Sequence, residues 1–403
     1  MSIGGLSRNR LARMHDVLAE HVRGGRVPGL VSVLSRRGET QVDVVGSMAA
    51  DGRDPMSRDA LFRIASLTKP ITAVATMILI EECAVRLDDP VQQWLPELAD
   101  RQVLTRLDGP LTDTVPATRP ITVRDLLTFR LGWGQIMDRP EDYPILTAIR
   151  ERDLLGFGPP GVDYPLDPDQ WLARLAELPL MHQPGEKWMY NTGSYVLGVL
   201  IARVSGQPFE TFLARRVFEP LGMRDTAFHV PPDKLDRLTA AYQADPVTGE
   251  LRLDDGISDS KWRTPPAFPD GAAGLVSTVD DYLAFGRMML NLGRCDGDRI
   301  LSRPTVQAMI TDQLTPAQKA VSGFGPTWFA SRGWGLGVSV TTERAGGSAV
   351  PGQFGWDGGA GTTWYCDPAE DLIAILFTQR GGFPLMSPVY QDFWTLVYQA
   401  IDD

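Results

Sequence analysis

The alternation of apolar and polar positions predicts helices at both ends of the chain and a hairpin near its start. Residues 6–24 carry apolar side chains three and four positions apart, which is the spacing of an amphipathic helix. Residues 29–35 and 40–45 are β-like runs separated by a short polar turn, which predicts two paired strands. Residues 389–401 return to a helical pattern, so we expect a closing helix there.

Further strand-like runs lie in the last third of the chain. Residues 334–341, 362–366 and 372–378 are rich in β-branched and aromatic side chains and are separated by glycines. A Ser/Thr-x-x-Asp signature precedes residues 282–292, which predicts a capped helix before these strands. If the early hairpin pairs with the late strands, the two ends of the chain build one largely antiparallel sheet flanked by helices.

Between about residues 90 and 270 strand signals become sparse. Proline and glycine clusters there alternate with helical patches at 123–129, 170–177 and 195–204. The sequence therefore predicts an α/β (α+β) fold in which residues 1–90 and 270–403 form a discontinuous sheet domain. Residues 91–269 are expected to form a mainly helical insertion.

Composition narrows the class of protein. The 403 residues carry a net charge of −11 and 43% hydrophobic residues, which are globular values with an acidic balance. An acidic chain with a pI near 5.0 is a poor partner for nucleic acid or an anionic membrane surface. No apolar stretch approaches a membrane span, and the N-terminus lacks a signal peptide pattern, so we expect a cytoplasmic protein. The three cysteines are far apart, which suggests buried reduced thiols.

Ser66 and Lys69 form the candidate chemical centre. Ser66 comes just before a long apolar helical run, and a lysine three residues later lies on the same helix face, within reach of the serine hydroxyl. The unpaired amides at a helix start would favour negative charge beside the serine. Ser-x-x-Lys is a short pattern that also fits an ordinary helix cap with a solvated lysine. A second match at Ser258 and Lys261 lies in a polar loop, and we interpret it as coincidental.

Three motifs in order make the pattern more specific. After Ser66-Leu67-Thr68-Lys69 come Tyr190-Asn191-Thr192 and then the glycine-rich residues 354–363, which precede a strand. Together they resemble the serine β-lactamase and penicillin-binding superfamily, and most of all class C β-lactamases and family VIII carboxylesterases. The resemblance covers roughly residues 25–380. It implies a β-lactamase-like fold and an acyl-enzyme on Ser66, with Lys69 as base and Tyr190 as second proton carrier.

The resemblance also implies further site residues. One oxyanion donor is expected from the backbone amide of Ser66, and the second from Gly359 or Ala360 at the end of the third motif. In that motif Trp356-Asp357-Gly358 stands where relatives carry Lys-Thr-Gly, and Thr192 replaces an Asn. These departures weaken a β-lactamase interpretation. Asp357 would repel an anionic substrate if it faces the cleft, although it could equally be a solvated turn residue.

These observations favour a serine hydrolase of short-chain carboxylic esters. A β-lactam or peptide amide hydrolase, an acyltransferase, and a non-catalytic binding module remain as alternatives. The chain has no Gly-x-Ser-x-Gly and only four histidines, none of them in a His-Glu-x-x-His spacing. These absences disfavour an α/β-hydrolase, a Ser-His-Asp triad and a metal-dependent hydrolase. We expect no cofactor and no metal, and a small-molecule ester as the partner.

Overall fold

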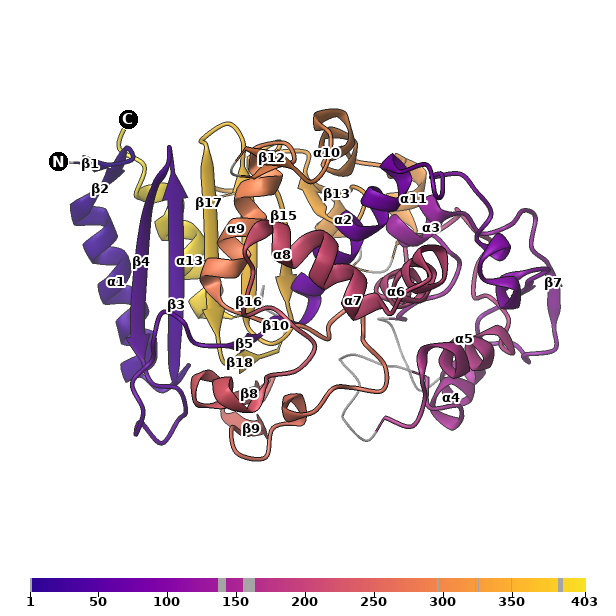
Figure 1. Ribbon diagram of the computed structural model, residues 1–403, viewed down its shortest axis with the longest axis horizontal. Coiled ribbons are helices and arrows are strands. Elements are labelled where there is room, and N and C mark those ends of the chain that lie inside the picture. The colour runs from indigo at the N-terminus through magenta and orange to yellow at the C-terminus, as the bar shows by residue number, and fades with distance from the viewer. Residues whose placement is uncertain are drawn as a thin grey trace.

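The two ends of the chain meet in one central sheet. The computed structural model describes residues 2–136, 143–154, 164–295, 297–322, 324, 326–348, 350–382 and 387–403. Seven antiparallel strands follow the order β13-β14-β15-β16-β17-β3-β4, so that a late strand pairs directly with an early one (Figure 1). Their bounds are β3 Gly29–Arg36, β4 Glu39–Gly46, β13 Arg332–Trp334, β14 Ser339–Thr341, β15 Phe354–Gly358, β16 Thr362–Asp367 and β17 Leu372–Thr378.

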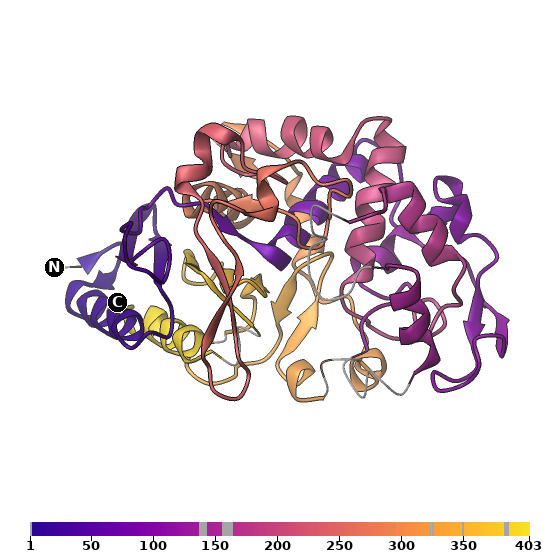
Figure 2. The same ribbon diagram turned by 90° about the horizontal axis from the view of Figure 1, so that it is seen from below.

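Helices cover both faces of this sheet. The N-terminal helix α1 (Arg8–Arg23) and the closing helix α13 (Pro388–Gln399) lie side by side on one face (Figure 2). Helix α9 (Val279–Leu290) packs against the other face. Alternate residues of β3 therefore enter different cores: Leu30 packs with α1 and α13, whereas Val31 packs in the main core. This burial on both sides explains why residues 29–35 carry apolar side chains on both faces of the strand rather than on one.

The part of the chain between the two sheet segments is largely helical. It contains α3 (Val123–Leu127), α4 (Pro144–Glu151), α5 (Pro168–Ala176), α6 (Thr192–Ser205) and α7 (Phe209–Leu213). It also holds two strand pairs that the sequence did not predict. They are β6 (Gln102–Leu104) with β7 (Thr114–Pro116), and β8 (Ala241–Ala244) with β9 (Leu251–Asp255). Strand β8 also pairs in parallel with β18 (Arg380–Gly381).

Short elements connect these layers. Helix α2 (Thr68–Glu81) follows a 3₁₀ turn at Ala65–Leu67 and runs between the sheet and α6. The other short strands and α-helices of the described ranges are β1 Ser2–Ile3, β2 Leu6–Ser7, β5 Phe62–Arg63, β10 Val276–Ser277, β11 Arg294–Cys295, β12 Asp298–Arg299, α8 Glu219–Leu221, α10 Arg303–Met309, α11 Pro316–Ala320 and α12 Pro326–Phe329.

The predicted fold class, an antiparallel sheet with flanking helices, is confirmed. Three details of the sequence analysis are wrong. Residues 334–341 are not one strand, because the chain turns between β13 and β14. Strand β15 was missed, and the cysteines are not all buried, since Cys83 is exposed and Cys295 is partly exposed. The division at residues 90 and 270 stays a prediction.

Two features of the described ranges bear on the expected partners. None of their helices combines the length and apolar character that a membrane crossing requires. Within the same ranges, no three His, Cys, Asp or Glu side chains gather as a metal site would require. The cytoplasmic location and the lack of a nucleic-acid partner stay predictions.

Candidate active site

Ser66 lies in a tightly held turn. It belongs to the 3₁₀ turn at Ala65–Leu67, just ahead of α2, where the sequence predicted an N-cap or first-turn residue of the helix. Ala65 has a φ of +44°, a left-handed conformation that costs energy for a residue with a Cβ. Two hydrogen bonds anchor the turn to other elements: Thr362 Oγ1 donates to the Ile64 carbonyl at 3.0 Å, and the Tyr282 hydroxyl donates to the Leu67 carbonyl at 2.8 Å.

The structure brings Ser66, Lys69 and Tyr190 together. Lys69 Nζ and the Tyr190 phenol oxygen each lie 2.8 Å from Ser66 Oγ. Lys69 is 1% exposed, whereas Ser66 is partly exposed and so open to a substrate. Lys69 Nζ also lies 4.6 Å from the centroid of the Tyr190 ring. A hydroxyl between an amine and a phenol has two proton carriers within hydrogen-bond distance.

Burial favours the neutral form of Lys69. Desolvation lowers the pKa of Lys69 to about 7, although the nearby Asp270 opposes this effect. Nζ donates to the Ala272 carbonyl at 2.8 Å, which fixes the direction of one N–H. A neutral amine held in this way can turn its lone pair toward the hydroxyl of Ser66.

Tyr190 is held from its backbone and from its phenol. The following residue, Asn191, has a φ of +90°, and the Tyr190 carbonyl accepts from the Gln135 amide at 3.0 Å. Trp188 stacks on the Tyr190 ring with centroids 5.7 Å apart. Trp356 Nε1 donates to the Tyr190 phenol oxygen at 3.0 Å. Burial raises the pKa of Tyr190, so the phenol keeps its proton at neutral pH.

The third motif lies beside the Ser66 turn. A Cβ placed on Gly358 would lie 2.3 Å from the Ile64 carbonyl oxygen, so only a glycine permits this approach of β15. Gly359 and Ala360 follow in the turn before β16. Among the hydrogen bonds of the described ranges, none uses the backbone N–H of Ser66, Gly359 or Ala360. These amides are therefore available as donors at the end of the strand.

Asp357 does not face Ser66, and neither position weighed from the sequence, cleft wall or solvated turn, is correct. Neighbouring residues of a strand point to opposite faces, so Trp356 reaches Tyr190 while Asp357 points toward α13. Its carboxylate accepts from Thr363 Oγ1 at 2.7 Å and from the hydroxyls of Tyr365 and Tyr390 at 3.0 and 3.2 Å. Asp357 therefore holds β15 in place from the face opposite Ser66 and does not form part of the wall around the serine.

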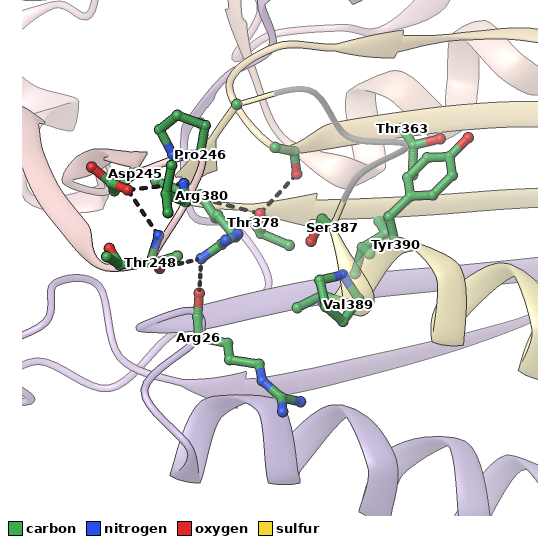
Figure 3. Close-up of a pocket in the computed structure, with 18 residues that line it drawn as sticks. Arg26, Asp245, Pro246, Thr248, Thr363, Thr378, Arg380, Ser387, Val389 and Tyr390 are labelled. Atoms are coloured by element: carbon green, nitrogen blue, oxygen red, sulfur yellow. Dashed lines mark hydrogen bonds between the residues drawn. The ribbon is translucent and has the colours of Figure 1, made fainter.

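A cavity of about 430 Å³ lies on that same far face (Figure 3). Thr363 and Tyr390 line it, together with Thr378 and Arg380. The Arg380 guanidinium donates to the carbonyls of Arg26 and Gly249, both at 3.1 Å. Ser66, Lys69 and Tyr190 do not line this cavity, so it does not open onto the serine.

Thr192 is the remaining predicted residue. It begins helix α6 and is 4% exposed. In the part of the chain that the structure describes, its side chain makes no hydrogen bond to Ser66, Lys69 or Tyr190. Its position therefore links it to the second motif but gives it no direct contact with the serine.

Two groups near Lys69 were missed by the sequence analysis. They are the Ala272 carbonyl, which accepts from Nζ, and the carboxyl group of Asp270, which is 0% exposed. The segment Pro269-Asp270-Gly271 has the composition of an ordinary turn, so no local signal distinguishes it.

The family model for beta-lactamase matches residues 14–389, which is most of the chain. The chain belongs to the beta-lactamase family. It is 40% identical over 364 residues to Protein Rv1367c of Mycobacterium tuberculosis (strain ATCC 25618 / H37Rv), covering 88% of this chain and 86% of that protein. It is 31% identical over 401 residues to Esterase EstB of Burkholderia gladioli, covering 94% of this chain and 92% of the esterase.

A solved structure supports the same placement. The structure of EstCE1, described as a hydrolase with promiscuous acyltransferase activity, superposes with a TM-score of 0.78 at 25% identity. The match covers 98% of this chain and 99% of EstCE1. The predicted resemblance to the serine β-lactamase and penicillin-binding superfamily is thus confirmed. The chain is a beta-lactamase-fold hydrolase with relatives among esterases and acyltransferases.

Proposed function

We propose that this hydrolase cleaves short-chain carboxylic esters through an acyl-enzyme on Ser66. The observation that carries the proposal is the position of Ser66 Oγ, 2.8 Å from both the buried Lys69 amine and the Tyr190 phenol. A serine hydroxyl is a weak nucleophile without an adjacent base, and a desolvated lysine supplies one. The similarity to Esterase EstB favours esters as the substrate class.

In the proposed acylation, Ser66 Oγ bonds to the ester carbonyl carbon while its proton moves to Lys69 Nζ. The amides of Ser66 and of Gly359 or Ala360 would donate to the oxyanion that forms. When the ester C–O bond breaks, its electron pair leaves with the alkoxide. Tyr190 gives its proton to the alkoxide, and the proton held by Lys69 restores the phenol. Water then repeats the sequence in reverse and releases the acid.

An acyltransferase shares every step up to the acyl-enzyme and differs only in the acceptor. The similarity to EstCE1, a hydrolase with promiscuous acyltransferase activity, supports this second function. A β-lactamase is less well supported, because Trp356 occupies the place where relatives carry the lysine that helps to hold a β-lactam carboxylate. With Asp357 on the far face of the sheet, this argument rests on Trp356 and on Thr192, which replaces an Asn of the relatives.

The test combines labelling with turnover. A fluorophosphonate should add to Ser66 with loss of fluoride, as located by intact mass and peptide mapping. Ser66→Ala should lose both the label and ester turnover. Ser258→Ala is the matched control, since Ser258 is an exposed loop residue within the second Ser-x-x-Lys pattern, and it should retain both. We expect kcat/KM for an aryl acetate or butyrate to exceed that for a chromogenic cephalosporin by at least about 10², or 2.7 kcal/mol.

Each alternative has its own outcome. Equal efficiency on the cephalosporin would favour a β-lactamase, and formation of a new ester with an added alcohol at the expense of acid would favour an acyltransferase. Label on Ser258, or no label at all, would refute the proposed nucleophile.

A further inference from the structure

Asp270 is a buried carboxyl group with an incomplete set of hydrogen bonds. It is 0% exposed and lies in the loop before β10. Its Oδ1 accepts from the Ala272 amide at 2.6 Å, and the Ala273 amide also stabilises the carboxylate, whereas its Oδ2 is buried without a partner at full hydrogen-bond geometry among the described ranges. A buried carboxylate oxygen with no donor is costly, and the cost is lower when the group is neutral, because burying a charge costs more than burying a neutral polar group.

The loop that carries Asp270 is bound to the lysine helix at two successive turns. The Ala272 carbonyl accepts from Lys69 Nζ at 2.8 Å, and the Gly271 carbonyl accepts from Thr72 Oγ1 at 2.7 Å. Residue Ala272 therefore contacts both groups, since its N–H donates to Asp270 and its C=O accepts from Lys69. In the described part of the chain, Ala272 thus lies between the two side chains and fixes the loop that carries Asp270 against Lys69.

Few other groups near Asp270 can change charge at neutral pH. The titratable side chains that interact with it are Lys69 on α2, Tyr190 just before α6, Tyr195 in the first turn of α6, and Tyr164 before α5. Burial raises the pKa of all three tyrosines, so they remain neutral. Burial also raises the pKa of Asp270, to about 7, while it lowers that of Lys69. Asp270 and Lys69 are thus the two groups in this region whose charges can change near neutral pH.

We propose that Asp270 is a positioning residue that shares one proton with Lys69 and so sets how much of the lysine is amine, the form that accepts the proton of Ser66. This inference rests on the proposed ester hydrolysis at Ser66. When Asp270 holds the shared proton, both groups are neutral and Lys69 can act as a base. When Lys69 holds it, the carboxylate offsets the ammonium in a region that water does not reach. No net proton is gained or lost in this exchange.

The test is the pH dependence of Asp270→Asn. The variant keeps an acceptor for the Ala272 amide but has no charge, so the attraction that favours the ammonium is gone. The acid limb of kcat/KM, which reports the free enzyme, should therefore move to lower pH by about one unit, a tenfold change in proton affinity. The maximum should fall by about tenfold, because the ammonium formed in the transition state loses its counter-charge. The rate of Ser66 phosphonylation by the fluorophosphonate should show the same limb.

Two further variants keep the test decisive. Asp270→Ser, which places less bulk in the loop, should show the same displacement if Asp270→Asn fails to fold by circular dichroism. Asp281→Asn is the matched control, since Asp281 is also a buried carboxyl group but bonds Thr226 and the Asp225 amide. Its acid limb should stay at the wild-type pH.

The outcomes separate this inference from the function on which it rests. A lower maximum with an unmoved limb, or a limb displaced to higher pH, would overturn the role of Asp270 while ester turnover by the wild type still stands. Absence of ester turnover and of Ser66 labelling in the wild type would instead remove the proposed function itself.

Discussion

At the scale of single residues, the proposed mechanism gives Lys69 and Tyr190 one proton path, so the losses caused by replacing each of them should not add. Lys69→Ala and Tyr190→Phe should each lower kcat by about 10² or more, the range for losing a general acid or base. The double variant should be no slower than the worse single variant by more than about threefold. Steady-state kinetics on an aryl acetate, at saturating substrate, measures all three.

Tyr398→Phe is a suitable control for the phenol. Tyr398 donates to Asp367 at 2.9 Å from helix α13, remote from Ser66, and its replacement should leave kcat unchanged. Small and additive losses in the two site variants would mean that another group carries the proton.

How much of the site could be predicted depends on sequence separation. Ser66 and Lys69 are three residues apart, so helix geometry alone places them together. Tyr190 contacts Ser66, and Trp356 contacts Tyr190, from distant segments, and only the resemblance to a family brought them into one site. The buried role of Asp357 and the presence of Asp270 could not be predicted, because each depends on which face of a distant element covers the side chain.

At the scale of elements, a glycine sets how closely the turn between β13 and β14 approaches α2, the helix that carries Lys69. Gly337 has a φ of +87°, and a Cβ placed on it would lie 2.2 Å from the Cβ of Ala73 in α2. Gly337→Ala should therefore cost about 3 kcal/mol or more of unfolding free energy, from left-handed strain and overlap together. It should also lower kcat/KM, since relief of the overlap displaces the helix that carries Lys69. Chemical unfolding and ester turnover measure the two effects.

Gly206→Ala is the matched control for Gly337→Ala. Gly206 has a φ of +67° at the end of α6, and nothing lies within 4 Å of its added Cβ. It carries the same backbone strain without the overlap, so about 1–2 kcal/mol should be lost with kcat/KM unchanged. Equal losses in both variants would show that close approach to α2 is unimportant.

Glycines also explain why the sequence did not predict strand β15. Strand β15 contains Gly355, where a Cβ would lie 2.1 Å from the Trp364 carbonyl oxygen, and Gly358, which approaches Ile64. Strand propensity reflects side chains packing on a pleated surface, and glycine has none. In β15 the glycines allow neighbouring segments to pack closely, and this reason for a glycine can be recognised only when the partner element is known.

At the scale of the whole molecule, the central sheet joins segments from opposite ends of the chain. Strand β17 pairs with β3 over seven residue pairs, from Leu372 with Arg36 to Thr378 with Leu30. The sequence predicted this pairing only conditionally, from two sets of apolar runs. The small strands β8 and β9 were not predicted, since short exposed strands such as Leu251–Asp255 lack an apolar pattern.

A buried ion pair joins the region of β9 to the strand that leads into the Ser66 turn. Arg63 in β5 and Asp255 in β9 have side chains that are 4% and 2% exposed. Arg63 Nε donates to Asp255 Oδ2 at 2.8 Å, and Ser260 Oγ donates to the same oxygen at 2.7 Å. Removing one partner of such a pair leaves a charge buried without compensation, which costs more than the intact pair contributes.

Asp255→Asn should therefore destabilise the protein by about 3–5 kcal/mol, the range for breaking a buried pair. Urea unfolding should show a lower midpoint with an unchanged slope, because the surface exposed on unfolding stays the same. Asp108→Asn is the control, since its pair with Arg106 is on the surface, with side chains 55% and 71% exposed, and its midpoint should not move. Because Arg63 lies three residues before Ser66, Asp255→Asn should also lower ester turnover at temperatures where the protein remains folded. A midpoint equal to that of the control would show that the junction between β5 and β9 is held by packing rather than by this ion pair.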